Sequence, residues 1–573
     1  MENSRNMILA IVLSVVVLIG WGFIAERIAP TANEPSTEFV DGEQVPVEQP
    51  ESNVVPDTPV ERRELAEVLS DSQGDRIVIE SPRIEGSMNL RGARFDDLVL
   101  TDYRVTIDPD SPAQRLLAPA GVEGSNFAEF GWAGGDIETP GRDALWQADA
   151  ERITPGEPVT LRWRNGTGQL FAIVIELDEN YRFQVSQRVS NFGDAPVSTQ
   201  SYALIQRTGE SPDPDNWLIH TGPTYYSAGD LDHINFGDVR EEGTNGNRFA
   251  LTNGWLGFND KYWLTALFPQ SGSADAAFQP LSGDRYQAVY SNTAQVVQPG
   301  RAITTRADFF AGAKEVTLLE AYDEDDGLTQ IDLSVDWGWF YFFELPLFYV
   351  LHWLFMTIGN FGVAIICLTI IVRGLMFPIA QKQFKSFAAM RAIQPKMKEL
   401  QERHKDDKQK MQQEVLALYQ KEKVNPLAGC LPMFLQIPIF YALYKVLMLS
   451  VEMRHEPFAL WLKDLSAPDP LTPVNLFGFL DFTPPTYLAI GILPILLGVT
   501  MWLQFKLNPA QMDPTQQKIF GIMPWVFMVI MAPFAAGLQL YWTTSNILTI
   551  AQQKWLYSRD PRLKEQAKAV AAE

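Results

Sequence analysis

The chain has 573 residues, of which 46% are hydrophobic and 20% are charged, and its formal net charge is −23. Residues 28–340 carry 22 basic and 51 acidic side chains, so the remaining residues are mildly basic as a group. So much negative charge would repel phosphate and argues against nucleic-acid binding, and the two cysteines, both in apolar stretches, exclude a disulfide scaffold.

The first predicted element is a transmembrane anchor at residues 1–27. Its apolar stretch has nearly the length of a span, and no small-residue cleavage site follows it. We therefore interpret it as an uncleaved anchor rather than a signal peptide. Residues 28–72 contain many prolines and acidic residues and almost no aromatic ones, which predicts a disordered linker.

Residues 73–336 consist of short segments of alternating apolar and polar residues separated by Gly, Pro and Asn. This pattern predicts a large antiparallel β-sandwich domain. Within it, Val159–Arg164 and Gln169–Glu176 flank an Asn-Gly pair and predict a hairpin. Ala313–Tyr322 has helical spacing of apolar residues.

Two histidines in this domain, His220 and His233, raise the alternative of an enzyme, because aspartates lie near the second. However, no phosphate-binding loop, metal-spaced cluster or nucleophile elbow accompanies them. We therefore predict no catalytic residue, no metal site and no cofactor.

The rest of the chain predicts a polytopic α-helical membrane protein, because four further charge-poor stretches follow. The last of these, 519–553, is too long for one span and has Pro533 and Gly537 near its middle, so it predicts two. With the anchor, the total is six spans. The predicted segments are an interfacial aromatic helix (337–345), span two (346–380), a cytoplasmic helical hairpin (381–423), span three (424–451), a periplasmic loop (452–483), span four (484–505), a cytoplasmic turn (506–518), spans five (519–534) and six (536–555), and a cytoplasmic tail (556–573).

The orientation follows from the basic residues, which concentrate on the cytoplasmic side of membrane proteins. The stretch 382–423 has 11 basic and 6 acidic residues, whereas the loop after span three is acidic. Both termini are therefore expected in the cytoplasm and the β-sandwich domain in the periplasm, as in a bacterial inner-membrane protein.

The hairpin prediction rests on apolar residues spaced by three and four positions, such as Ile393, Met397 and Leu400 and then Val415 and Leu418. We expect Pro395 to kink the first helix. The basic side chains on the outer faces form either a docking surface for cytosolic partners or merely a solvated loop, and the sequence does not decide between them. The candidate docking residues are Lys396, Lys398, Arg403, Lys405 and Lys408.

Arg373 is the charged residue of greatest interest, because apolar sequence continues about two helical turns beyond it. We therefore expect it inside span two. It could reach the headgroups along its own side chain, but we favour a position facing a wet cavity. Deep in spans two to six there is no acidic residue, which disfavours a proton-coupled transporter. Polar residues that could line the same space include Thr369, Gln436, Gln504, Ser545 and Asn546.

Several strings in order resemble the YidC/Oxa/Alb family of membrane protein insertases. They are LTIIVRGLMFP (368–378), QPKMKELQERHKDDKQK (394–410), EKVNPLAGCLPMFLQIPIFYALY (422–444), PFALWLKDLSAPDP (457–470) and GLQLYWTTSN (537–546). The resemblance implies an insertase and membrane chaperone with a hydrophilic groove that contains Arg373, Thr369 and Trp542. The implied partners are nascent membrane proteins, the SecYEG translocon and its associated Sec components, membrane lipids and, bound weakly through the hairpin and tail, ribosomes and targeting factors.

Overall fold

The computed structural model describes residues 37–40, 43–46, 62–134, 137–213, 219–243, 246–324, 327–382, 393–404, 407–422, 431–477, 479–480, 489–507 and 514–559. The chain divides into two compact units, 1–56 and 57–573. In the first unit, β1 (Thr37–Val40) and β2 (Glu43–Pro46) pair as an antiparallel hairpin. The predicted anchor at 1–27 lies outside the described residues.

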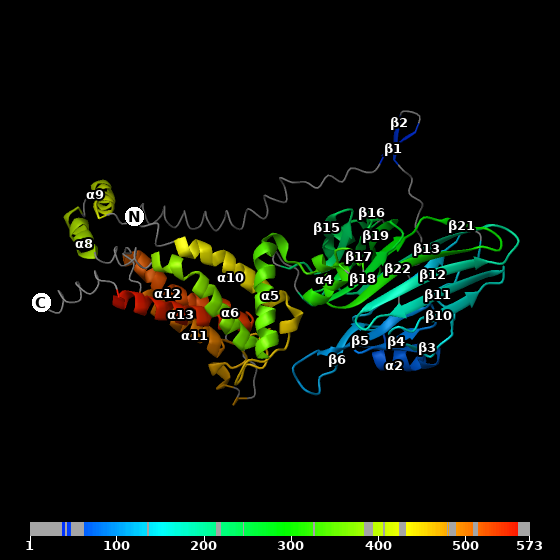
Figure 1. Cartoon of the computed structure of the whole chain (residues 1–573), viewed down its shortest axis with the longest axis horizontal. Helices are drawn as coiled ribbons and strands as arrows, with labels where there is room; N and C mark the ends of the chain where they lie inside the picture. Colours follow the sequence, from blue (N-terminus) through cyan, green and yellow to red (C-terminus); the bar gives the residue numbers. More distant parts are fainter. Residues whose placement is uncertain are drawn as a thin grey trace. The chain divides into compact units, whose positions relative to one another are not determined.

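The second unit begins with a two-sheet β domain (Figure 1). Among the described residues, one sheet has the strand order β15 (Asp230–His233), β14 (Gly222–Ser227), β17 (Trp255–Asn259), β18 (Trp263–Pro269), β22 (Ala302–Ala313), β12 (Arg182–Asn191), β11 (Gln169–Leu177), β10 (Val159–Arg164) and β8 (Gln147–Ala148). The other has the order β16 (Asn247–Thr252), β19 (Ser273–Leu281), β20 (Arg285–Ser291), β13 (Val197–Thr208), β7 (Asn126–Ala133), β5 (Arg94–Arg104), β4 (Ile84–Asn89), β3 (Arg76–Glu80) and β9 (Arg152–Ile153), with β21 (Gln295–Val297) beside β13 and β6 (Ala113–Leu117) beside β5.

The predicted antiparallel sandwich is confirmed, apart from one short parallel pair, β3 with β9. Its core lies between the sheets, where Phe95 and Phe130 of one sheet meet Phe183 and Phe309 of the other, with ring centroids 5.1 Å apart for Phe95 and Phe183. Two helices, α3 (Phe236–Glu241) and α4 (Val316–Glu324), follow strands of the domain. The helical spacing noted at Ala313–Tyr322 corresponds to α4, which begins at Val316 and buries Val316, Leu319 and Tyr322 on one face.

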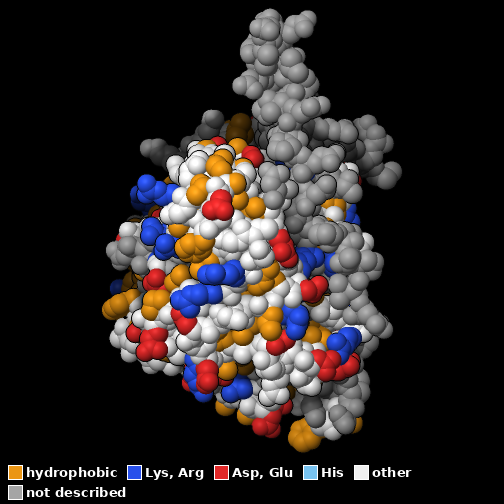
Figure 2. All heavy atoms as spheres, turned by 90° about the vertical axis from the view of Figure 1, so that its right-hand side faces the viewer, with side chains coloured by type: hydrophobic (Ala, Val, Ile, Leu, Met, Phe, Trp, Pro, Cys, Tyr) orange, Lys and Arg blue, Asp and Glu red, His pale blue; other side chains and the backbone are white. Residues whose placement is uncertain are grey.

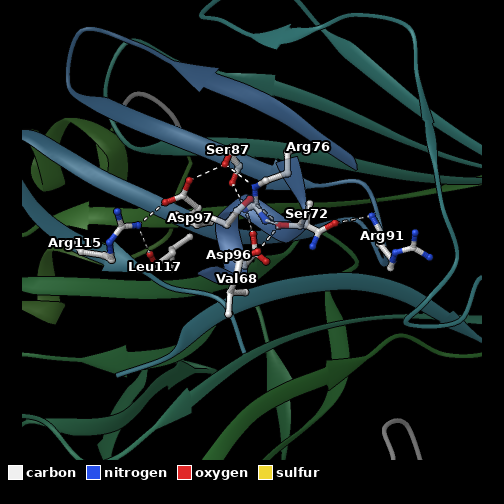
Figure 3. A network of polar contacts seen from close by, with 11 residues as sticks. Val68, Ser72, Arg76, Ser87, Arg91, Asp96, Asp97, Arg115 and Leu117 are labelled. Atoms are coloured by element: carbon white, nitrogen blue, oxygen red, sulfur yellow. Dashed lines mark hydrogen bonds and ion pairs between the residues drawn. The ribbon is translucent and has the colours of Figure 1, made fainter. Parts of the chain in front are cut away.

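The linker prediction for 28–72 is wrong in part, because residues 65–71 form the helix α2 (Leu65–Asp71). Its apolar residues recur at helical spacing, a signal that the preceding prolines obscured. Just beyond α2, Arg76 lies in a polar network in which its guanidinium donates to Ser72 and Ser87 and pairs with Asp96 (Figure 3). The side chains of Arg76 and Asp96 are only 7% and 4% exposed.

The acidic charge of this domain does not form a single field on the face drawn in Figure 2, where acidic and basic side chains are interspersed. Many of the acids have nearby arginine partners, such as Asp102 and Glu315 with Arg83, or Glu80 with Arg152. The net charge therefore gives no reason to assign a polycation-binding surface to this face.

The helical part of the second unit follows the β domain. Its helices are α5 (Tyr341–Ile358), α6 (Phe361–Leu375), α8 (Gln394–Arg403), α9 (Lys408–Lys421), α10 (Leu431–Leu449), α11 (Ile492–Leu507), α12 (Pro514–Met531) and α13 (Ala536–Arg559). The predicted hairpin of spans five and six corresponds to α12 and α13, joined by a turn at 532–535. Gln539 supports this turn by donating to the carbonyl oxygens of Met531 and Phe534.

The segment predicted as span two, 346–380, is divided by a sharp break. Gly359 ends α5 with a left-handed φ of 73°, and Asn360 begins α6 by accepting a hydrogen bond from the backbone N–H of Val363. In Figure 1, α5 crosses the direction of α6, α10, α11 and α13. The interfacial aromatic helix predicted at 337–345 thus continues to residue 358, and the bundle helix begins at Phe361. The prediction from charge-poor stretches missed this break, because Gly359 and Asn360 are uncharged and do not interrupt such a stretch.

The end of α6 also differs from expectation. α6 ends at Leu375, with Arg373 in its last turn, and residues 377–382 are helical again after a one-residue turn at Met376. Pro378 explains the early end, since proline cannot donate the backbone hydrogen bond that would continue the helix. In this position the guanidinium also meets the negative end of the helix dipole.

The two helices α8 and α9 form a small separate core. Ile393, Met397 and Leu418 are buried there, against Leu400, Val415 and Tyr419. Asp407 caps α9 by accepting from the backbone N–H of Lys410 at 3.0 Å. The kink expected at Pro395 is absent, because this residue occupies the first turn of α8, where its missing N–H leaves no intrahelical bond unmade.

Glu452, in the loop after α10, joins the helical part to the β domain. Its Oε1 accepts from the backbone N–H of Val316, the first residue of α4, at 3.2 Å. Its neighbour Arg454 donates to the carbonyl oxygens of Arg104 and Val105. Burial raises the pKa of Glu452 from 4.5 to about 7, and the nearby carboxylate of Glu315 adds to the effect.

This buried carboxyl group predicts a pH-dependent stability. Below pH 4.5 it is protonated in both the folded and the unfolded chain, whereas above pH 7 the folded chain must bury a carboxylate, at a cost of about 3 kcal/mol. We expect Glu452→Gln to raise the melting temperature of the purified chain at pH 8, and the gain to shrink to a small fraction at pH 5. An equal gain or loss at both pH values would contradict this assignment, and Glu85→Gln, on an exposed residue of β4, is the control.

Candidate functional site

The candidate site is built around Arg373, in the last turn of α6. Its Nε donates to the hydroxyl of Ser545 on α13 at 3.0 Å, and one terminal nitrogen of the same guanidinium donates to the same oxygen. Ser545 is 2% exposed, so the contact is shielded from bulk solvent. This contact joins α6 to α13, and the polar space that we expect around Arg373 stays a prediction.

Tyr541 extends the contact to a third helix. It lies one turn before Ser545 on α13, close enough to Arg373 for the two to interact electrostatically, and its hydroxyl accepts from Nε2 of Gln436 on α10 at 3.1 Å. We call Arg373, Ser545, Tyr541 and Gln436 the Arg373 cluster. It ties α6, α10 and α13 together by polar contacts inside otherwise apolar helices.

Asn546 lies next to the cluster but bonds in another direction. Its side-chain amide donates to the hydroxyl of Thr500 on α11 at 3.2 Å. Within the described part of the chain, three further buried side-chain atoms of α13, Gln539 Oε1, Thr543 Oγ1 and Gln553 Oε1, have no hydrogen-bond partner. Buried polar groups without partners are uncommon, so they add to the hydrophilic character of α13.

Besides Asn546, three predicted site residues are not bonded into the cluster. The hydroxyl of Thr369 is fully buried and donates to the carbonyl of Ile365 in its own helix, at 2.7 Å. Trp542 packs its ring against Phe440 and Phe527, at centroid distances of 4.3 and 4.7 Å. Gln504 is half-buried near the end of α11, and no contact among the described residues joins it to Arg373.

The charge balance of the site is unusual. Across the described ranges, no carboxylate forms an ion pair with Arg373, whose hydrogen-bond partner there is the hydroxyl of Ser545. A buried cation without an anion is costly, and inside a membrane such a residue is a functional candidate. The arrangement leaves Arg373 able to interact with a polar or acidic segment that reaches it.

The structure describes the side chains of only some of the predicted docking residues of the α8–α9 hairpin. Lys396 and Arg403 are exposed, and each pairs with an acid of its own chain, Glu422 at 2.7 Å and Glu399 at 2.8 Å. Lys398 and Lys408 lie in α8 and α9, but their side chains are not described, and Lys405 lies outside the described residues. These pairs lower the positive charge that two of the five residues offer to a partner.

Tyr541 and Thr500 were missed by the sequence reasoning. A helical projection could have found Tyr541, because Tyr541, Ser545 and Thr549 recur every four residues. No comparable pattern in the sequence marks Thr500. It lies on α11 and meets Asn546 only because α11 packs against α13.

By length and hydropathy, one helix of the described residues, Gly338–Ile358, is long and apolar enough to cross a membrane. The other apolar helices are shorter; α6, for example, rises about 22 Å against a hydrocarbon thickness of about 30 Å. The count of six spans therefore stays a prediction.

A β-sandwich domain joined to a bundle of apolar helices with a buried cation defines a membrane protein with a large extramembrane domain. Two family models match it: "60Kd inner membrane protein" over residues 353–564 and "YidC periplasmic domain" over 76–350. The chain is 45% identical to the membrane protein insertase YidC of Zymomonas mobilis over 97% of this chain and 96% of that one, and 42% identical to the YidC of Roseobacter denitrificans over 96% and 95%.

Among solved structures, an active YidC insertase with its first transmembrane domain resolved is 20% identical and covers 83% of this chain and 92% of that one; its TM-score of 0.36 is too low to establish a shared fold. The sequence matches are sufficient by themselves. The chain belongs to the YidC family of membrane protein insertases, which is not a family of enzymes, and it is an inner-membrane protein with a periplasmic β domain.

Proposed function

We propose that this chain inserts and helps to fold inner-membrane proteins through a hydrophilic groove at the Arg373 cluster. The polar outer segment of a nascent protein is solvated beside Arg373 while its apolar helix moves into lipid. The observation that carries the proposal is the cation of Arg373, held by Ser545 in an apolar bundle with no carboxylate partner among the described residues. The family and the names of its relatives support the same function.

The driving force in this mechanism is burial of the substrate's apolar helix. Each buried CH₂ group contributes roughly 0.8 kcal/mol, so a whole span releases far more free energy than the passage of a short polar tail requires. The helices α6 and α11 are shorter than the hydrocarbon thickness of about 30 Å, so the polar tail crosses a thinner barrier beside them. No nucleotide is needed.

The proposed topology has six spans, with both termini and the α8–α9 hairpin in the cytoplasm. The substrates are nascent membrane proteins, received alone or together with SecYEG. Ribosomes and targeting factors would bind weakly to the hairpin and tail, because Lys396 and Arg403 are already paired within the chain.

Reconstitution tests the function directly. The purified chain in liposomes should insert a single-span substrate with a short, nearly uncharged outer tail, measured as a protease-protected fragment. Adding four charged residues to that tail should reduce the protected fraction at least ten-fold, because each charge must cross the hydrocarbon region. Equal protection in protein-free liposomes would refute the function, and uptake of a small solute would favour a transporter.

A further inference from the structure

The loop between α10 and α11 carries a group of exposed apolar side chains at residues 471–480, which we call the apolar loop. No charged residue occurs in the sequence between Asp469 and Asp481. The exposed side chains are those of Val474, Leu476, Phe477, Phe479 and Leu480. Phe479 is 88% exposed, the most of the five. Contiguous exposed apolar side chains of this kind mark surfaces that contact a protein or a membrane.

Several backbone groups of the apolar loop form their hydrogen bonds within the loop. The N–H of Phe477 donates to the carbonyl of Thr472 at 2.9 Å. The N–H of Leu480 donates to the carbonyl of Asn475 at 3.1 Å, and the hydroxyl of Thr472 accepts from the N–H of Val474 at 3.3 Å. These groups lose little when water around them is replaced by lipid, because a buried polar group is costly only without a partner. The backbone of the loop is therefore compatible with an apolar environment.

Asp469 fixes the base of the apolar loop to the start of α11. Its buried carboxylate accepts from the backbone N–H of Leu493, in the first turn of α11, at 2.7 Å. The other oxygen accepts from the indole N–H of Trp461 at 2.9 Å and from the backbone N–H of Leu471 at 3.0 Å. The depth of the apolar loop in the membrane is therefore set by the depth at which α11 begins.

The length of α11 places its start below the outer headgroups. Its 16 residues rise about 24 Å, whereas the hydrocarbon region is about 30 Å thick. The opposite end carries Lys506, whose ammonium lies 5.0 Å from the ring centre of Trp502. Lysine and tryptophan at a helix end are typical of the interface between hydrocarbon and headgroups. With this end at the cytoplasmic interface, the start of α11 lies inside the outer hydrocarbon boundary, and the exposed side chains of the apolar loop meet acyl chains.

We propose that the apolar loop inserts its exposed side chains among the acyl chains of the outer leaflet, with Phe479 the deepest. The inference goes beyond the insertion mechanism and rests on the proposed topology, in which this loop faces the periplasm. Lipid is favoured over a second protein as the occupant, because protein partners are selected by charge and hydrogen-bond groups. The apolar loop has no charge and uses these backbone groups internally. Its insertion holds the outer end of α11 at a constant depth in the membrane.

Spin labels at single cysteines test the proposal in liposomes of phosphatidylethanolamine and phosphatidylglycerol that contain the purified full chain. The background carries Cys367→Ala and Cys430→Ala, and the labels are attached to the variants Phe479→Cys and Val474→Cys. Because oxygen is enriched in hydrocarbon and a polar nickel chelate is excluded from it, we expect the ratio of oxygen to chelate accessibility to be about five-fold higher at both positions than at a control position in water.

The matched control is Phe192→Cys, which labels another largely exposed phenylalanine position, directly after β12 in the β domain. Chelate accessibility at Phe479→Cys and Val474→Cys equal to that of the control would overturn the proposal, because the loop would then lie in water. Low accessibility to both reagents would also overturn it, since the loop would then be covered by protein, such as a second copy of the chain. The second labelled position keeps the test valid if Phe479→Cys disturbs the loop.

Substrate insertion by the same labelled chains, measured as the protease-protected fraction, separates this inference from the proposed function. Normal insertion by a chain whose apolar loop lies in water would refute this inference alone. An apolar loop immersed in lipid without any substrate insertion would refute the proposed function and leave this inference intact.

Discussion

Arg373→Ala is expected to reduce the initial rate of insertion of a short-tailed single-span substrate by about ten- to a hundred-fold. The variant removes the cation that would solvate the polar segment of the substrate, and a hydrogen bond to a charged group is worth about 1.5–3 kcal/mol. It also leaves the buried hydroxyl of Ser545 without its donor. The measurement is the protease-protected fraction over time in liposomes that contain equal amounts of each variant.

Two further variants separate the charge from its position. Arg373→Lys keeps the cation and should retain most of the rate, although it cannot reproduce both bonds from one guanidinium to Ser545. Lys506→Ala removes an exposed cation near the end of α11 and should have little effect. Normal insertion by Arg373→Ala, or an equal loss in Lys506→Ala, would refute the assigned role.

Asp96→Ala is expected to destabilise the β domain by about 3–5 kcal/mol, which corresponds to a fall in melting temperature of roughly 10 °C. The change leaves the guanidinium of Arg76 buried without its counter-ion, with only the hydroxyls of Ser72 and Ser87 and one carbonyl oxygen as acceptors (Figure 3). Thermal unfolding of the full chain, followed by tryptophan fluorescence, measures the effect.

The control is Glu80→Ala, which breaks the exposed pair of Glu80 with Arg152. Exposed pairs contribute at most about 1 kcal/mol, so the melting temperature should change little. The double variant Arg76→Met with Asp96→Leu should be less damaging than Asp96→Ala, since it removes both charges together. A double variant as unstable as the single one would show that packing, rather than the unpaired charge, determines the loss.

Sequence patterns over a few residues predicted those parts of the fold that depend on interactions between residues close in the chain. The alternation in Val159–Arg164 and Gln169–Glu176 correctly predicted β10 and β11, but the loop between them is longer than a two-residue turn. Its left-handed residue is Gly168, with φ at 95°, and Asn165 instead accepts from the backbone N–H groups of Thr167 and Gln169. Charge and hydropathy do not report such details, which depend on hydrogen bonds formed only in the folded loop.

The same limit explains the errors in the helical part. An uncharged Gly359-Asn360 pair breaks a helix without changing hydropathy, and Pro378 ends α6 although the apolar sequence continues. At the site, the apolar sequence on both sides of Arg373 singled it out from the sequence alone. Its bond to Ser545 and the link to Gln436 through Tyr541 depend on how α6, α10 and α13 pack, which spacing within one helix cannot reveal.

Photo-crosslinking to a ribosome-arrested membrane nascent chain tests most directly whether substrates pass the Arg373 cluster. The crosslinker is placed at Gln436 and Trp542, which are partly buried on α10 and α13, and at Val529, which is exposed on α12 and lies two residues from the Trp542 partner Phe527. The account predicts adducts with the nascent chain from Gln436 and Trp542, and few from Val529. Adducts from Val529 without adducts from the other two positions would contradict it.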